Sequence, residues 1–248
     1  MKTILALETS APYLSVALGN RKGRVRELVS KIPLSHSENL IPLIDRLLRK
    51  EGLAPADVDA FAIDRGPGSF TGLRIGFSLL KGFLAVRKRP CYGALSLDMM
   101  SRQISAAGEI RLGVVVDARR EKVYARFYRS RRGTWVPERK LELLSPPELN
   151  SQMTRGTVLA GESLERYHFG HKIRPVVPTA HTLAEWFYEK DPRLLALSDP
   201  RDFLPLYLRA SEAEEKRRAK KAPRGVGPPG VRPERAGGPP GGYAARNR

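Results

Sequence analysis

An ungapped internal repeat constrains the fold of this 248-residue chain more than any other feature. The segment "LALETSAPYLSVAL", which begins at Leu5, aligns with "VVVDARREKVYARF", which begins at Val114, 109 residues later. In each copy an apolar run ends at an acid, Glu8 or Asp117, and a second strand-like stretch follows a short turn. A period this long is too large for a solenoid and fits two duplicated lobes. We expect an N-terminal lobe at residues 1–106 and a C-terminal lobe at residues 107–210, with a boundary placed only to within several residues.

Strand and helix patterns alternate along the chain, which favours an α/β fold whose sheets are covered by helices. Expected strands lie at 4–7, 13–18, 58–63, 112–116 and 123–128 and near Val158, and expected helices at 35–52, 71–86, 146–153 and 181–190. In the first helix Ser35 and Glu38 form a candidate capping box and Gly52 a stop, while Pro42 predicts a kink unless the helix begins nearer Ser37 or Asn39. The last two helices complete the second lobe; a C-terminal helix that crosses between lobes is the alternative.

Charge and composition divide the body of the chain from its C-terminal end. From Ala222 onward, thirteen of twenty-seven residues are Gly or Pro, so residues 211–248 are predicted to be a disordered basic tail. The net charge of +18 is spread over the tail and the body, which favours an anionic partner such as RNA without establishing one. We expect a truncation after Ala210 to weaken RNA binding if the tail contacts RNA. The single cysteine, Cys91, excludes an internal disulfide, and with no signal peptide or membrane span recognised the expected location is cytoplasmic.

The stretch "DRGPGSFTGLRIG", residues 64–76, has the glycine content of a phosphate-binding loop but not its spacing. A P-loop requires a Lys directly after its second glycine, and this stretch has none. A dinucleotide fingerprint requires a third glycine, which is also missing. Phosphate binding at the amides of Thr71 and Gly72 stays possible but unspecific. Gly72 and Gly76 lie one turn apart on the helix that follows, which predicts close approach by another element. That element is either the protein's own sheet or a helix of another subunit.

Five segments together resemble the bacterial TsaB (YeaZ) family: "ILALETS", "SHSENLIPLIDRLL", "DRGPGSFTGLRIG", "VDARREKVYARFY" and "PLYLR". The resemblance implies an actin-like, ribonuclease-H-like fold of two duplicated lobes. It also implies a non-catalytic subunit required for N6-threonylcarbamoyladenosine modification of tRNA, which dimerises with and activates a TsaD-type catalytic subunit, together with a TsaE-type ATPase. The resemblance further implies that the chain forms a homodimer when alone and contacts tRNA through the complex. It implies no membrane partner.

The same resemblance assigns the partner contacts to two helices and the loop before the second. The implied partner-binding residues are Leu40, Leu43, Leu47, Gly66, Pro67, Gly68, Ser69, Phe70, Thr71, Gly72, Arg74, Gly76 and Leu80. No catalytic residue, metal or cofactor of its own is expected, and ATP at the assembled complex is left open. Ser96 and Met100 occupy the positions where TsaD-like relatives carry two metal-binding histidines. Glu8, where the family commonly has Asp, and Asp117 would mark a vestigial nucleotide cleft.

Two other functions stay open at this point. The first is a stand-alone ATPase or kinase, in which Glu8 and Asp117 face each other across a cleft and "LAGES", at 159–163, supplies a short adenosine loop. The second is a peptidase, for which the sequence offers neither a Ser/His/Asp arrangement nor a zinc motif. His168 and His171 are three residues apart but have no obvious third ligand. The resting oligomeric state and the role of the tail are not determined by the sequence.

Overall fold

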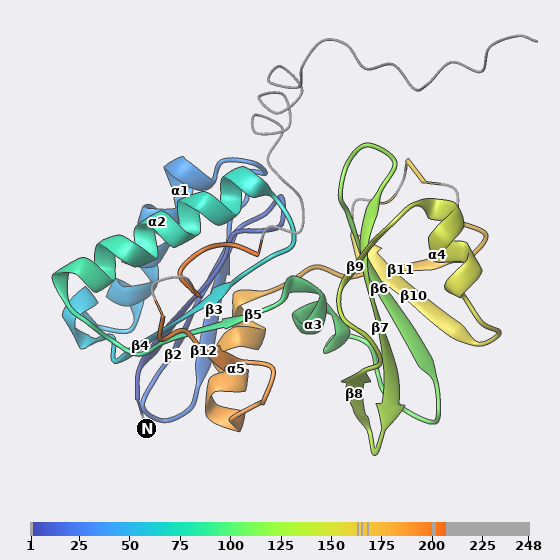
Figure 1. The fold of residues 1–248 in the computed structure, drawn as a ribbon. Coiled ribbons are helices and arrows are strands. Elements are labelled where there is room, and N and C mark those ends of the chain that lie inside the picture. Colours follow the sequence, from blue (N-terminus) through green and yellow to red (C-terminus); the bar gives the residue numbers. More distant parts are fainter. Residues whose placement is uncertain (1, 163, 165, 168, 200–201, 207–248) are drawn as a thin grey trace, which may run out of the picture. The chain divides into compact units, whose positions relative to one another are not determined.

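The computed structural model describes residues 2–162, 164, 166–167, 169–199 and 202–206, all within one compact unit, Met1–Arg209. The predicted tail, His168 and Ser163 lie outside the described residues. The described chain forms two mixed sheets with helices against them (Figure 1). No helix in this part of the chain is long and apolar enough to cross a membrane.

The first sheet has the strand order β12-β5-β4-β1-β2-β3. Strands β1 to β3 form an antiparallel meander, and β4 and β5 run parallel to β1. The short strand β12 adds antiparallel to β5. The bounds of the six strands are β1 Ile4–Glu8, β2 Ser15–Gly19, β3 Val25–Val29, β4 Ala60–Asp64, β5 Cys91–Ala94 and β12 Leu195–Ala196.

The second sheet repeats this topology in the order β11-β10-β6-β7-β8, with β9 also paired to β7. Its strands are β6 Arg111–Asp117, β7 Val123–Arg131, β8 Thr134–Pro137, β9 Glu142–Leu144, β10 Thr157–Glu162 and β11 Ile173–Pro175. Again three antiparallel strands are followed by two that run parallel to the first. The repeat aligns β1 with β6 and β2 with β7, so the predicted fold of two duplicated lobes is confirmed.

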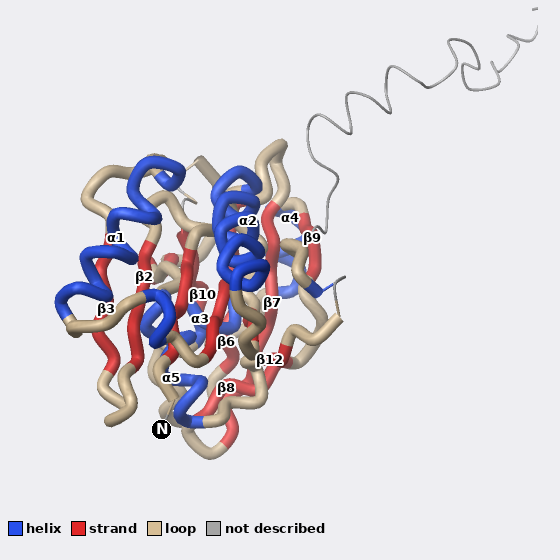
Figure 2. Tube along the Cα trace, turned by 90° about the vertical axis from the view of Figure 1, so that its left-hand side faces the viewer, coloured by secondary structure: helices blue, strands red, loops and turns tan. Residues whose placement is uncertain are grey.

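Helices cover both faces of the first sheet because β1 is apolar on both sides. Leu5 and Leu7 pack in one core with α1 (His36–Lys50) and α2 (Phe70–Val86), while Ile4 and Ala6 pack in another with α5 (Ala180–Glu189). Figure 2 shows α1 and α2 side by side over the sheet. Helix α5 is anchored where the Ala180 amide donates to the Ser15 hydroxyl at 2.9 Å. The expectation that this helix completes the second lobe is therefore wrong. The alternative, a C-terminal helix that crosses back to the first lobe, is correct, because the apolar side of α5 packs against the small alanines of the first sheet. The boundary near residue 106 stays a prediction.

Two shorter helices cover the second sheet. Leu97 and Met100 of α3 (Ser96–Ser101) join Leu112, Val114 and Val116 in one core. Leu149 of α4 (Pro146–Gln152) packs in the other core, which holds Val115. Alternate residues of β6 thus face opposite helices, as the two-residue period of a strand requires.

A buried carboxylate on α3 ties this helix to the second sheet. Both oxygens of Asp98 accept from Nη1 of Arg126 at 2.8 Å, and the Tyr128 hydroxyl donates to Oδ1 at 2.6 Å. Burial raises the pKa of Asp98, and the adjacent Arg126 charge opposes that rise. Because α3 follows β5 directly, this cluster fastens the end of the first sheet to the second.

Local signals at the first helix are partly confirmed. Gly52 adopts φ +66° and ends α1 through a bond from its amide to the Arg49 carbonyl, and a single 3-10 turn, η1 (Pro55–Asp57), follows. The predicted capping box is wrong: Ser35 is the N-cap, but its hydroxyl donates to the Ile32 carbonyl and accepts from Asn39 instead of bonding a helix amide. Pro42 lies inside α1 on its exposed side.

Candidate functional site

The glycine-rich loop between β4 and α2 is bonded to the turn that follows β1. The Ser69 amide donates to the Ser10 carbonyl at 2.7 Å, and the Gly66 amide donates to Oδ1 of Asp64, also at 2.7 Å. Ser69 then caps α2 by accepting from the Gly72 amide. Three of the loop's polar groups are therefore used within the chain, and Gly66 needs its glycine because φ is +90°.

Gly72 and Gly76 make the close approach that their spacing predicts, and the element they approach belongs to the same chain. A Cβ at Gly72 would lie 2.0 Å from the Thr9 carbonyl oxygen, and one at Gly76 would lie 2.5 Å from the Thr9 hydroxyl. Both glycines are buried. Of the two alternatives, the structure supports packing within the chain, against the turn that follows β1 of its own sheet, so these glycines are not open to a partner.

A buried acid cluster lies under this loop, at the ends of β1 and β4. Ser10 Oγ lies 2.7 Å from Oε1 of Glu8 and 2.6 Å from Oδ2 of Asp64, and both acids are fully buried. A hydroxyl carries one proton and can donate to only one of the two carboxyls. The other must donate to Ser10, so the cluster holds a proton.

Both carboxyls of the cluster are shifted toward the neutral, protonated form. Burial, and next the negative charge of Asp64, raise the pKa of Glu8 well above its usual range, although Ser10 and Ala11 donate to it. Burial also raises the pKa of Asp64, to about 6, against donors that include Ser10, Gly66 and Ser96. The longer Glu8 side chain reaches back to the Ser10 amide at 2.5 Å. A fully buried pair of acids that shares a proton through Ser10 is unsuited to holding a nucleotide-bound cation, so Glu8 does not fit the predicted nucleotide cleft.

Asp117 ends the matching strand of the second lobe in different surroundings. Its Oδ1 accepts from the Arg119 amide and from the Tyr167 hydroxyl, each at 2.7 Å, and it also pairs with Arg166. The prediction that both acids end strands is confirmed. Each acid, however, is engaged by its own lobe.

The leucines assigned to partner contacts are core residues. Leu40, Leu43, Leu47 and Leu80 are 7% exposed or less and pack with β1 and β2. Gly66 and Pro67 are also buried, and Gly68 would place a Cβ 2.6 Å from that of Ser10. The predicted apolar side of the helix is confirmed, but this side packs against the protein's own first sheet. This corrects those assignments, because a side chain inside the monomer core cannot contact another subunit.

The exposed side of the same two helices carries a different set of residues. Thr71, Arg74 and Ser78 recur along α2 at three- and four-residue spacing, and Ile41 of α1 is 60% exposed. The Arg74 guanidinium lies 3.9 Å from the centre of the half-buried Phe70 ring. We call Ile41, Phe70, Thr71, Arg74 and Ser78 the α1–α2 surface. Ile41 and Ser78, which the sequence reasoning missed, follow from the same helical period once the buried side is known.

The two positions that match the metal-binding histidines of TsaD-like relatives, and the candidate adenosine loop, have structural roles. Ser96 donates to Oδ1 of Asp64 at 2.8 Å, and Met100 is buried. No cluster of three His, Cys, Asp or Glu side chains able to hold a metal occurs in the described part of the chain. Residues 159–162 of the proposed adenosine loop lie in strand β10, and Gly161 packs against the Val115 carbonyl. That assignment is therefore wrong for the described residues.

Comparisons with known proteins agree with this fold. Residues 28–148 match the family model "TsaD: tRNA N6-adenosine threonylcarbamoyltransferase". The chain is 33% identical over 161 residues to the tRNA threonylcarbamoyladenosine biosynthesis protein TsaB of Escherichia coli, covering 64% of this chain and 68% of that one. The chain belongs to the TsaB family. A TsaB of Bacillus subtilis is 27% identical over 86% of this chain and 97% of its own length. The solved structure of YeaZ from Pseudomonas aeruginosa superposes with a TM-score of 0.68 at 28% identity, over 84% of this chain and all of that one.

Proposed function

We propose that this chain is a non-catalytic subunit in tRNA N6-threonylcarbamoyladenosine biosynthesis, which dimerises with and activates a TsaD-type catalytic subunit. The observation that carries the proposal is the 33% identity to the Escherichia coli TsaB, whose name states that pathway. The partner's lobes would be related to this chain, since a TsaD family model matches residues 28–148. A TsaE-type ATPase and tRNA join through the complex in the cytoplasm, ATP binds at the assembled complex, and the chain pairs with itself when alone.

The non-catalytic part of the proposal is supported by the two strand-end acids. Glu8 is buried and shares a proton with Asp64 through Ser10, and Asp117 is bonded to Tyr167 and paired with Arg166. The Ser10 hydroxyl is bonded between two acids and His36 Nε2 lies 2.9 Å from the Ala11 carbonyl, which disfavours a peptidase. We therefore do not propose the stand-alone ATPase or kinase, nor a peptidase.

The contact with the TsaD-type subunit is assigned to the α1–α2 surface. It combines the exposed Ile41 with the cationic Arg74 beside Phe70, and apolar side chains with arginine are typical of interface centres. The buried leucines position this surface, since they pack both helices against the same face of the first sheet.

The first experiment is reconstitution of tRNA threonylcarbamoylation from TsaC-, TsaD- and TsaE-type proteins of the same organism, with and without this chain. We expect modification only when the chain is present, and no ATP hydrolysis by the chain alone. Modification at the same rate without the chain would refute the proposed function.

A second experiment tests the contact surface. Ser78→Trp places a large side chain on the exposed side of α2 and should weaken binding of the TsaD-type subunit by at least about 10-fold, measured by titration calorimetry. The matched control is Asn150→Trp, at an exposed position of α4, which should bind normally. Equal affinity of the two variants would place the contact elsewhere while leaving the proposed pathway intact.

A further inference from the structure

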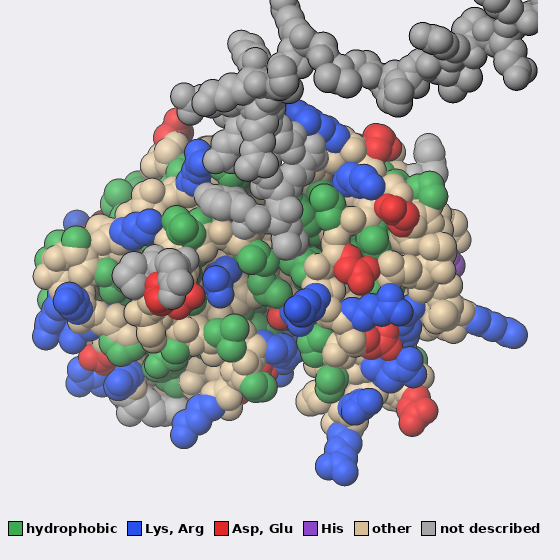
Figure 3. Space-filling model, viewed as in Figure 1, with side chains coloured by type: hydrophobic (Ala, Val, Ile, Leu, Met, Phe, Trp, Pro, Cys, Tyr) green, Lys and Arg blue, Asp and Glu red, His purple; other side chains and the backbone are tan. Residues whose placement is uncertain are grey.

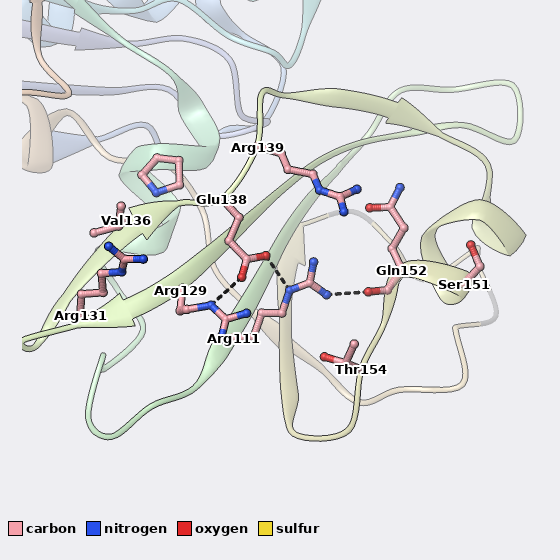
Figure 4. Close-up of a pocket in the computed structure, with 10 residues that line it drawn as sticks. Arg111, Arg129, Arg131, Val136, Glu138, Arg139, Ser151, Gln152 and Thr154 are labelled. Carbon is pink, nitrogen blue, oxygen red and sulfur yellow. Dashed lines mark hydrogen bonds and ion pairs between the residues drawn. The ribbon is translucent and has the colours of Figure 1, made fainter.

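A hollow of about 810 Å³ lies in the second lobe, lined by the β7–β8 hairpin, the start of β6 and the end of α4 (Figure 4). Four arginines and one acid line it: Arg111, Arg129, Arg131, Arg139 and Glu138. None of the five was singled out from the sequence. They come from three separate segments, and only the second sheet brings them together.

Arg111 is held rigidly at the base of the hollow. Its Nε donates to Oε2 of Glu138 at 2.7 Å and its Nη1 to the Gln152 carbonyl at 2.6 Å. The guanidinium also lies 4.2 Å from the centre of the Phe127 ring, and the side chain is only 14% exposed. An arginine oriented in this way loses little further side-chain entropy when it faces an anion.

Glu138 neutralises only part of this charge. It is shared by two arginines, since Nε of Arg129 donates to its second oxygen at 2.9 Å. Burial favours the neutral acid, but the hydrogen bonds and charges of Arg111 and Arg129 outweigh burial and lower the pKa of Glu138. Arg131 and Arg139 are exposed, and neither pairs with an acid among the described residues. The hollow therefore carries net positive charge.

We propose that this hollow binds the phosphodiester backbone of RNA. Arg131 and Arg139 contact phosphates, while Arg111 and Arg129, fixed by Glu138, supply positive potential from the base. Guanidinium groups match phosphate oxygens in geometry and charge. The hollow is open and far larger than one phosphate group, and Figure 3 shows Lys and Arg side chains over this lobe. The choice of RNA among phosphate-bearing ligands rests on the proposed function.

The test measures binding of the full-length chain to a fluorescently labelled tRNA that reads a codon beginning with A, by anisotropy at two salt concentrations. Arg131→Ala/Arg139→Ala should weaken binding about 10-fold at low salt and make the dependence of log affinity on log salt shallower by about two. Both side chains are exposed, so the variant should unfold at the wild-type temperature.

The duplicated fold offers a matched control. Arg21→Ala/Lys22→Ala removes the same charge from the β2–β3 turn, the equivalent of the β7–β8 turn, and both residues are exposed. This control should lose less than about 2-fold in affinity, as expected for charges that do not contact phosphate. Equal losses in the two variants would overturn the proposal in favour of diffuse attraction by a basic protein.

A further arm separates RNA from a small phosphorylated ligand. Binding of ATP and of inorganic phosphate is measured with the same variants; if Arg131→Ala/Arg139→Ala abolishes their binding and leaves tRNA affinity unchanged, the proposal is overturned. Because the binding assay needs no catalytic partner, its outcome is independent of the reconstitution experiment. Modification that requires the chain, with tRNA affinity unaffected by the arginine pair, would remove the RNA site and retain the proposed function.

Discussion

The two lobes share one topology, but the turn after the first strand is buried in one lobe and exposed in the other. In the first lobe the turn at residues 9–11 is at most 5% exposed, lies under α2 and holds the buried acid cluster. In the second lobe Arg119, Arg120 and Glu121 are exposed and have φ of 63°, 50° and 53°. The duplicated fold thus keeps its strands while one copy uses this turn for packing and the other leaves it at the surface.

Each of the two turns depends on an unfavourable structural feature. The first turn depends on glycines that permit backbone contact, and on a proton held away from water. The second depends on three consecutive left-handed residues, which are unfavourable for any residue with a side chain. Each feature can be tested by substitution at one position.

The largest expected effect is at Gly72. Gly72→Ala would place a Cβ 2.0 Å from the Thr9 carbonyl oxygen, so we expect a loss of more than about 4 kcal/mol in the free energy of unfolding. Gly82→Ala is the control on the same helix: nothing lies within 4 Å of its Cβ, and higher helix propensity should add up to about 1 kcal/mol. Urea denaturation measures both. Similar midpoints would mean that the first turn is not held by α2.

The next effect concerns pH and compares Glu8 with Asp117. The folded-state pKa values of Glu8 and Asp64 are raised, the latter to about 6, so the folded state binds more protons than the unfolded state above about pH 4. The stability they contribute is complete below that pH and is lost as pH rises, by up to about 1.4 kcal/mol per pH unit for each proton.

Glu8→Gln keeps a neutral side chain at the same place. We compare the free energy of unfolding of the variant with that of the wild type at each pH by urea denaturation. The difference, variant minus wild type, should rise by more than about 1 kcal/mol from pH 5 to pH 8. Asp117→Asn is the matched substitution in the second lobe. If its effect changes with pH as much as that of Glu8→Gln, the proposed difference between the two acids is wrong.

The smallest effect tests the second turn. Glu121→Gly relieves a left-handed backbone at φ 53°, whereas Glu121→Ala removes the same side chain and keeps the strain. The glycine variant should be about 1 kcal/mol more stable than the alanine variant, measured by thermal unfolding. Equal stabilities would mean that the exposed turn relaxes without cost.

Much of the fold was predictable because its signals are local. The repeat located β1, β2, β6 and β7, and Gly52 correctly ended α1 since a left-handed residue after a helix favours glycine. The predicted helix at 71–86 differs from α2 by one residue at its start. Cys91 is buried, as expected of a single cysteine in an apolar setting.

The candidate site was less predictable, because the sequence shows a residue's type but not its surroundings. The spacing of Leu40, Leu43 and Leu47 indicates an apolar helix side, yet the same spacing suits a monomer core or a subunit contact. The basic hollow could not be anticipated, since Arg111, Arg131 and Arg139 are separated along the chain and become neighbours through β6 and the β7–β8 hairpin.

The sequence alone determined the duplicated α/β architecture, the strand-end acids, the glycines of α2 and the resemblance to the TsaB family. These depend on periodicity and backbone preference over a few residues, or on motifs that can be compared directly. Only the tertiary structure decided that α5 packs on the first sheet, that the leucines are covered by their own sheet, that Glu8 and Asp64 share a proton and that four arginines share one hollow. Burial, protonation and local potential depend on which distant segments surround a side chain, and folding alone sets that arrangement.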